Sequence, residues 1–227
     1  MASELLLEIG TEEIPARFIP PVLDEMAVSF KKLMEQERIA CGEVATWGTP
    51  RRLALVARDM AAAQAEVSQE IIGPPKAVAF DAAGKPTPAA LGFAKTQGVE
   101  VSDLIEVNTP KGIYLAVGKK AAGRPALERL QEALPQFIQG LSFPKSMRWG
   151  ALSFTFARPI HWIVARFAGQ TISFPLADVV SGGVTYGHRF LAPEALEVED
   201  SQAYGTVLKA ATSSWTQRPA GPSWSRN

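Results

Sequence analysis

A chain of 227 residues, 47% of them hydrophobic, is long enough to bury a substantial core as one large domain or two small ones. No run of about 18 apolar residues occurs, and the first residues lack the basic start and long apolar core of a signal peptide, so we expect a soluble, cytoplasmic protein without a membrane span. Cys41 is the single cysteine, which excludes an internal disulfide, and we interpret it as an inert thiol.

Charge is distributed unevenly although the formal net charge is zero, with 23 basic and 23 acidic residues. Residues 1–43 hold nine acids and four bases, whereas residues 107–177 hold two acids and nine bases. The basic half could therefore face a polyanion. A solvated basic surface with no partner is equally compatible with the charge pattern.

The first sixty residues alternate between strand and helix patterns. Residues 4–9 predict a strand, and residues 19–41 predict one amphipathic helix with two prolines in its first turn. Two further strands are expected over residues 44–47 and 52–58. Arg51 and Arg52 follow the turn between them, so we expect both to stand exposed at a sheet end, either as binding groups or as ordinary surface arginines.

The middle of the chain predicts smaller units. Residues 61–75 are ambiguous and end in an extended link, and residues 78–80 indicate a short strand. Thr87 and Pro88 then predict a helix start that Gly98 closes. Residues 113–117 indicate a strand, and Pro125 opens an amphipathic helix that runs to residue 141.

The connection before that last helix carries Lys119, Lys120 and Arg124, next to Gly118 and Gly123. Backbone donors and cations could converge there on a phosphate. The connection is not a P-loop, because no glycine-rich nucleotide-binding fingerprint occurs in the chain.

Two segments near residue 150 each place an arginine and a tryptophan beside a proline, and they contribute Lys145, Arg148 and Arg158. Residues 152–156 alternate between apolar and polar side chains as in a strand. Arg158 is two residues after Phe156, so continued alternation would place its side chain on the apolar face. Either the strand ends before Pro159 or the guanidinium turns inward to a partner. If Arg158 has a functional role, the N–H groups of its planar guanidinium would donate hydrogen bonds to a phosphate.

The last third predicts more antiparallel sheet. Residues 160–167 are typical of a central strand, and a hairpin leads into residues 172–176. Residues 185–191 indicate a short strand that presents His188 and Arg189. Residues 194–211 are acidic and amphipathic, and residues 212–227 have no periodicity, which predicts a disordered tail.

The sequence shows no self-contained active site, and we assign no catalytic residue. Glu12 and Glu13 could be a carboxylate pair, but neighbours in an extended segment diverge. His161 and His188 have no cysteine or carboxylate at metal-ligand spacing, so no metal site is predicted. His161 lies in an apolar strand, where a hydrogen-bonded core histidine is a more common role than a catalytic base.

Five segments taken together resemble one known family. They are Leu5-Leu6-Leu7-Glu8-Ile9-Gly10-Thr11-Glu12-Glu13-Ile14-Pro15, Gly48-Thr49-Pro50-Arg51-Arg52-Leu53-Ala54, Phe143-Pro144-Lys145-Ser146-Met147-Arg148-Trp149, Arg158-Pro159-Ile160-His161-Trp162 and Gly187-His188-Arg189-Phe190-Leu191. Their order and spacing are similar to the amino-terminal part of the beta subunit of bacterial heterotetrameric glycyl-tRNA synthetase. The match runs from residue 4 to about residue 211 and fades near Thr212.

The resemblance implies a cytoplasmic ligase that uses ATP and magnesium to join glycine to tRNA(Gly), with two alpha and two beta subunits. In that family the alpha subunit carries the aminoacylation site, and the beta subunit supplies tRNA binding and assembly. Family beta subunits are several times longer, so the chain resembles a truncated or frame-shifted fragment. Such a fragment is expected to bind no cofactor and to be inactive alone.

The expected fold is α+β, with antiparallel sheet pieces and covering helices. Residues 1–211 would form the body, with an inserted subdomain at about 66–140, and residues 212–227 a non-native tail. We expect one surface to meet tRNA or the alpha subunit, formed by Arg51, Arg52, Lys145, Arg148, Arg158 and Arg189. The alternative is a scaffold that packs against the alpha subunit and contacts no RNA.

Overall fold

The computed structural model describes residues 3–81, 84–149, 154–210 and 216–218. The fold is α+β, as the sequence predicts, and its named strand pairs are all antiparallel. The chain divides into two compact units, one formed by Met1–Gln64 with Arg124–Asn227 and the other by Ala65–Gly123. Among the described residues, no helix is long and apolar enough to cross a bilayer.

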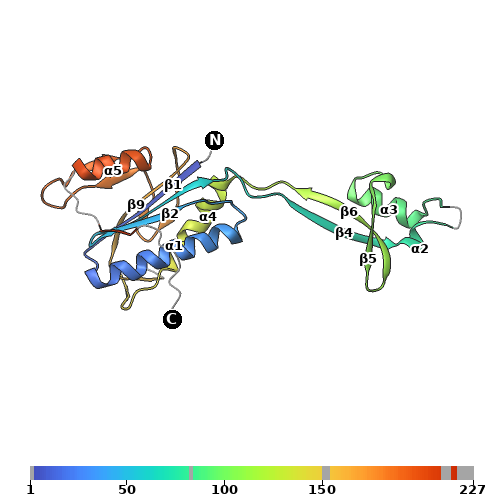
Figure 1. Ribbon diagram of the computed structural model, residues 1–227, viewed down its shortest axis with the longest axis horizontal. Coiled ribbons are helices and arrows are strands. Elements are labelled where there is room, and N and C mark those ends of the chain that lie inside the picture. The colour runs from blue at the N-terminus through green and yellow to red at the C-terminus, as the bar shows by residue number, and fades with distance from the viewer. Residues whose placement is uncertain (1–2, 82–83, 150–153, 211–215, 219–227) are drawn as a thin grey trace. The chain divides into compact units, whose positions relative to one another are not determined.

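The first unit is built on a six-stranded sheet with the order β10-β9-β1-β3-β2-β15. Its strands are β1 (Ser3–Thr11), β2 (Val44–Thr49), β3 (Arg52–Met60), β9 (Ile160–Phe167), β10 (Gln170–Thr171) and β15 (Thr216–Arg218). Strand β1 pairs with β3 on one side and with β9 on the other (Figure 1). The first strand of the sequence is therefore at the centre of the sheet.

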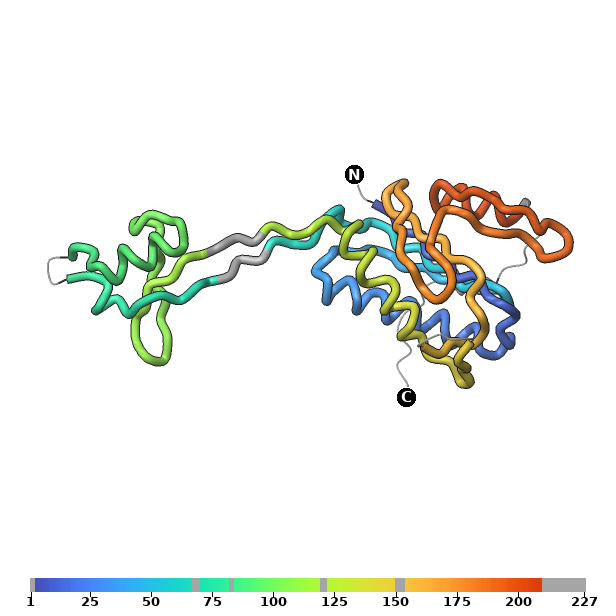
Figure 2. Tube along the Cα trace, turned by 180° about the vertical axis from the view of Figure 1, so that it is seen from behind, coloured from blue at the N-terminus to red at the C-terminus, as the bar shows by residue number. Residues whose placement is uncertain are grey.

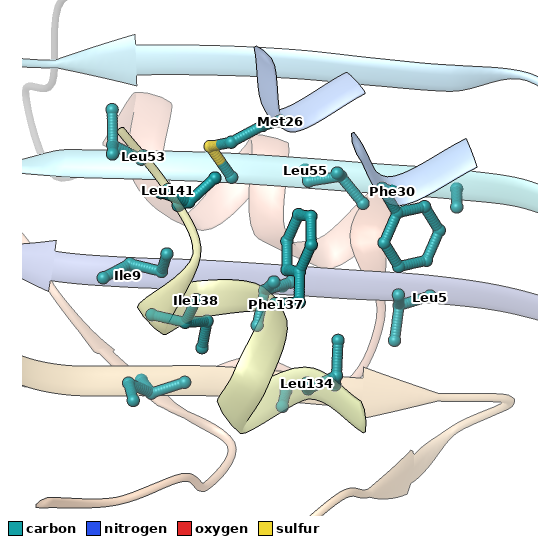
Figure 3. Close-up of a cluster of buried hydrophobic side chains, with 14 of the residues drawn as sticks. Leu5, Ile9, Met26, Phe30, Leu53, Leu55, Leu134, Phe137, Ile138 and Leu141 are labelled. Carbon is teal, nitrogen blue, oxygen red and sulfur yellow. The ribbon is translucent and has the colours of Figure 1, made fainter. Parts of the chain in front are cut away.

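Two helices cover one face of this sheet. They are α1 (Ile19–Gln36), which follows the short 3-10 helix η1 (Ala16–Phe18), and α4 (Ala126–Gln139). Figure 3 shows Met26 and Phe30 of α1 and Phe137 of α4 meeting the sheet residues Leu5 and Leu55. These side chains recur at helical spacing in the helices and at alternate positions in the strands, which is why this face forms the main core.

The opposite face of the sheet carries a second, smaller core under α5 (Ser201–Ala210). Tyr204 and Leu208 of the helix pack on Leu6, Val56 and Val164 of the strands. Figure 2 shows the chain from behind, with this helix on the side of the sheet away from α1 and α4. Since both faces are covered, strand β1 is buried from Leu5 to Thr11.

Short strand pairs complete the first unit. They are β7 (Met147–Arg148) with β8 (Thr155–Phe156), β11 (Pro175–Leu176) with β12 (Val179–Val180), and β13 (Val184–Tyr186) with β14 (Ala195–Glu197). Residues 150–153 lie outside the described part of the chain, so only the end of the strand expected over 152–156 is described. The strand expected over 185–191 ends at Tyr186, and His188 and Arg189 follow in a loop.

The second unit is a three-stranded sheet with the order β4-β6-β5. It consists of β4 (Val67–Pro75), β5 (Ile105–Thr109) and β6 (Gly112–Ala121), with α2 (Lys76–Ala79), α3 (Pro88–Gln97) and the 3-10 helix η2 (Val101–Asp103). The strand expected at residues 78–80 is wrong, because Lys76–Ala79 form a helical turn. Helix α3 begins after Thr87 and ends at Gly98, which adopts a left-handed φ of 72°, as predicted.

Two expected boundaries differ from the observed ones. The second unit ends at Gly123 rather than near residue 140, because α4 packs its apolar face on the sheet of the first unit. In the tail expected to be disordered, Thr216–Arg218 pair with β2, while residues 212–215 and 219–227 lie outside the described residues.

Candidate functional site

A buried carboxylate marks the centre of the candidate site. Glu8 lies on β1 with Leu6 and Gly10, on the side of the sheet that faces α5, and its side chain is 0% exposed. The indole Nε1 of Trp162 donates to Glu8 Oε1 at 2.5 Å, and the hydroxyl of Thr185 donates to the same oxygen at 2.7 Å. Buried carboxylates are tolerated only with such partners.

Gly10 makes room for the tryptophan that holds Glu8. In the sheet register Gly10 stands opposite Arg52 of β3 on one side and opposite Trp162 of β9 on the other. A Cβ atom at Gly10 would lie 1.9 Å from the indole ring. The ring therefore lies directly over the glycine backbone, and a side chain at this position would displace it.

Arg52 is buried, in contrast to the exposed position expected from the sequence. It is 3% exposed, because its place in β3 points it to the α5 side, beneath the segment that contains Tyr186. Its Nη2 donates to the carbonyl of Tyr186 at 2.5 Å, and its Nη1 lies 3.8 Å from Glu8 Oε2. The guanidinium also stands 5.9 Å from the centroid of the Trp162 ring.

Tyr204 of α5 completes what we call the buried polar cluster, which consists of Glu8, Arg52, Trp162, Thr185 and Tyr204. Burial raises the pKa of the Tyr204 phenol well above its ordinary value, and the nearby Glu8 carboxylate raises it further. The phenol is therefore a neutral hydroxyl beside the Glu8–Arg52 ion pair. The cluster connects three strands of the sheet, β1, β3 and β9, to β13 and α5, and such a buried polar network makes this part of the unit rigid.

Two hollows of about 260 and 360 Å³ lie above the cluster and share Arg51, Trp162, Gly187 and Arg189. The first hollow is also lined by Glu13, His188 and Phe190, and the second by His161 and Tyr186. We call the two together the Trp162 cleft. Trp162 is 8% exposed, so the cleft has an aromatic floor.

Positive and negative groups are interleaved at this cleft. Glu12 stands 3.8 Å from Arg189 Nη1 and 3.1 Å from His161 Nε2. Glu13 is exposed. Arg51 lines both hollows, so its guanidinium is a donor group at the cleft.

The histidines of the cleft differ in their hydrogen bonds. His188 Nδ1 accepts from the backbone N–H groups of Phe190 and Leu191, at 3.2 and 3.3 Å. In the neutral ring Nε2 therefore carries the proton and is a donor. His161 was expected to be a core histidine, but its side chain is 46% exposed, because it points away from the core beside Glu12.

The remaining basic candidates do not line the cleft. Lys145 and Arg148 are exposed at the β7–β8 hairpin, beside Phe143 and Trp149, which pack on the core under α1 and α4. Arg158 is half-buried, and its Nε donates to the carbonyl of Glu13 at 2.8 Å. The six expected residues therefore divide into Arg51, Arg52 and Arg189 at the cleft and three residues elsewhere.

Comparison with known proteins decides the family. A family model described as glycyl-tRNA synthetase beta subunit matches residues 5–217. The chain belongs to that family. It is 48% identical over 204 residues to the glycine–tRNA ligase beta subunit of Syntrophus aciditrophicus, which is 90% of this chain and 30% of that protein.

Other relatives give the same coverage. The glycine–tRNA ligase beta subunit of Moorella thermoacetica is 49% identical, over 92% of this chain and 30% of the relative. The glycine–tRNA ligase beta subunit of Syntrophotalea carbinolica is 50% identical, over 90% of this chain and 30% of the relative. The chain thus spans about 30% of the length of these relatives, at their amino-terminal end. The family match extends to residue 217, beyond Thr212, where the resemblance was expected to fade.

Four of the five segments that resemble the glycyl-tRNA synthetase beta subunit contribute to the cleft or to the cluster beneath it. Sequence reasoning selected the arginines and histidines of these segments but missed Glu8 and Tyr186. A single acid inside the apolar run of β1 was a usable signal for Glu8, because a lone charge among buried positions requires a partner. Nothing in the sequence pattern predicts that Tyr186 reaches the cleft.

Proposed function

We propose that the chain forms part of a glycine–tRNA ligase and uses the Trp162 cleft to bind tRNA(Gly). The complete ligase would be a cytoplasmic enzyme of two alpha and two beta subunits that joins glycine to tRNA with ATP and magnesium. In this proposal the present region assists tRNA binding and assembly with the alpha subunit. It leaves the chemical step to other parts of the enzyme.

The observation that supports this proposal is the convergence of donors from separate segments on one cleft. Arg51 comes from the β2–β3 turn, His161 from β9, and Arg189 from the loop after β13. Arginine and histidine donors are well suited to phosphate oxygens. Arg51 and Arg189 line both hollows, so the two guanidinium groups can approach one bound group.

Retention of tRNA(Gly) by the chain over a range of salt concentrations tests the proposal. We expect the double variant Arg51→Gln with Arg189→Gln to bind more weakly. The slope of log affinity against log salt should fall by about one for each phosphate that the variant no longer neutralises. The control is Lys32→Gln, an exposed lysine on α1, across the sheet from the cleft. Equal binding and equal salt slopes in the double variant and the parent chain would overturn the RNA role of the cleft.

The scaffold alternative is favoured by a separate observation. Val180 and Leu191 are 65% and 71% exposed, and apolar side chains this open are common where another protein packs. In this alternative the first unit contacts the alpha subunit and no RNA. Pull-down of purified alpha subunit, with and without tRNA, separates the two roles. The scaffold role predicts retention that does not depend on tRNA and is weakened by Leu191→Ser.

A further inference from the structure

Aromatic side chains stand at the rim of the Trp162 cleft beside its cations. Phe190 is 79% exposed and Tyr186 is 38% exposed, although both are large rings. The guanidinium of Arg189 lies 5.4 Å from the centroid of the Phe190 ring. Exposed rings next to arginines are typical of surfaces on which unpaired bases stack, because every base has a flat face that a ring can cover.

The charges of the cleft favour a ligand of mixed character over a simple polyanion. Outside the Glu8–Arg52 pair, Arg51 and Arg189 are balanced by Glu12 and Glu13. A polyanion that carries only phosphates would be attracted by the two arginines and repelled by the two glutamates. A nucleotide avoids this conflict, because its phosphate accepts hydrogen bonds while its ribose hydroxyls and exocyclic amines donate them.

The donors and acceptors of the cleft suit the two parts of a nucleotide. The guanidinium of Arg51 lines both hollows, and the neutral ring of His188 has a proton on Nε2, so both side chains can donate to a phosphodiester. Glu13 lines the same hollow and can accept from a hydroxyl or an amine. Both hollows, at about 260 and 360 Å³, are near the small end of ligand pockets, which is roughly 300 Å³.

We infer that the Trp162 cleft binds one or two unpaired nucleotides of single-stranded RNA, with a base stacked on Phe190 and a phosphate held by Arg51 and His188. The inference rests on the proposed function and specifies which part of an RNA the cleft takes. A duplex cannot substitute, because its bases are stacked on one another and hide the faces that Phe190 would cover.

Binding of a labelled single-stranded RNA decamer, followed by fluorescence anisotropy with the whole chain, tests the inference. Phe190→Ala should weaken binding by about tenfold, the usual effect of removing one aromatic ring on which a base stacks. The control is Val28→Ala, since Val28 of α1 is 69% exposed and is not among the residues that line the cleft. The control should bind as the parent chain does, and unchanged melting curves would show that both variants are folded.

Competition identifies the ligand class. Unlabelled single-stranded RNA should displace the decamer at least tenfold more effectively than an RNA duplex or inorganic polyphosphate at equal phosphate concentration. Equal displacement by polyphosphate would overturn the inference, as would equal loss of affinity in the two variants. If the chain retains tRNA(Gly) but not the decamer, the inference fails and the proposed function stands. If it retains neither RNA, both fail.

Discussion

Gly10 and Trp162 show how one residue sets the geometry of the cleft. The indole can donate to Glu8 only because it lies flat over a backbone that carries no side chain. Gly10 is the partner of both Arg52 and Trp162 in the sheet register, so the smallest residue is flanked by two of the largest. This arrangement places the ring against Glu8 and on the lining of the cleft.

We expect Gly10→Ala to destabilise the first unit by about 1–3 kcal/mol, the usual cost of overpacking a filled core. The methyl group would meet the indole at 1.9 Å, so the ring must shift away from Glu8. Urea denaturation followed by circular dichroism measures the loss. Gly205→Ala is the control within the same unit, because a Cβ atom on this α5 glycine meets nothing within 4 Å. Equal stability of Gly10→Ala and the parent chain would contradict this account of the site.

At the level of single residues, the sequence shows which side chains could bind a ligand more clearly than it shows which of them are buried. It selected Arg51 and Arg189 as candidate binding groups, and both line the candidate cleft, but it placed Arg52 at the surface, where the structure has it 3% exposed. Both Arg51 and Arg52 line the first hollow, and the sequence does not show which of the two another segment covers. That information depends on the loop after β13, which is far away along the chain.

Among the elements, α4 is held by an ion-pair network as well as by its apolar face. Arg124 pairs with Glu128 at 3.3 Å and with Glu132 at 2.7 Å. Arg129 pairs with Glu132 and, at 2.8 Å, with Glu37, the C-cap residue of α1. The network therefore links the two helices that cover the main core. It also engages Arg124, one of the three basic residues suggested for a phosphate cradle.

Glu132 makes this network sensitive to acid. A hydrogen bond from Arg124 holds the pKa of the Glu132 carboxyl below its ordinary value of 4.5. A carboxylate with a lowered folded pKa stabilises the protein above the unfolded value, and the stabilisation is lost as the pH falls through the folded value. We expect Glu132→Gln to lower the melting temperature slightly at pH 7 and not at all once Glu132 is protonated in the parent chain.

Melting curves across this acid range test the effect. Glu128→Gln is the matched control, because Glu128 lies on the same helix and has only the longer contact with Arg124. A small effect is expected, because exposed ion pairs are screened by salt. A difference between Glu132→Gln and the parent that does not change with pH would rule out the proposed role of the carboxylate.

Long elements with a clear period were predicted, whereas short ones were not. The apolar residues of α1 recur every three to four positions, and β1 and β3 combine strand-forming residues with turn signals at their ends. The four residues of α2 show no helical period, and Val78 and Phe80 favoured a strand. Context decides such a short segment, because one helical turn has little intrinsic stability.

At the scale of the whole molecule, the sequence indicates an inserted region but not its end. Helix α4 follows the second unit directly, and its amphipathic pattern fits a helix of either unit. Leu130, Leu134 and Ile138 are buried against the sheet of the first unit, which assigns the helix there. Which sheet a helix packs on is a long-range property that its own periodicity does not contain.

The chain leaves and re-enters the first unit at adjacent points, so the second unit should be removable. Ala63 bridges to Pro125, the N–H of Gln64 donates to Arg124 O at 3.0 Å, and the N–H of Ala126 donates to Ala62 O at 2.8 Å. A two-residue Asn-Gly turn suits such a pair of antiparallel ends.

Replacing residues 65–123 by Asn-Gly should leave a first unit that still folds cooperatively. The shortened chain should bind the RNA decamer within about twofold of the full chain, since every residue of the Trp162 cleft lies in that unit. Thermal denaturation and the anisotropy assay measure the two properties, with Phe190→Ala in the shortened chain as the control for binding at the cleft. A shortened chain that folds but no longer binds would show that residues 65–123 supply part of the RNA site.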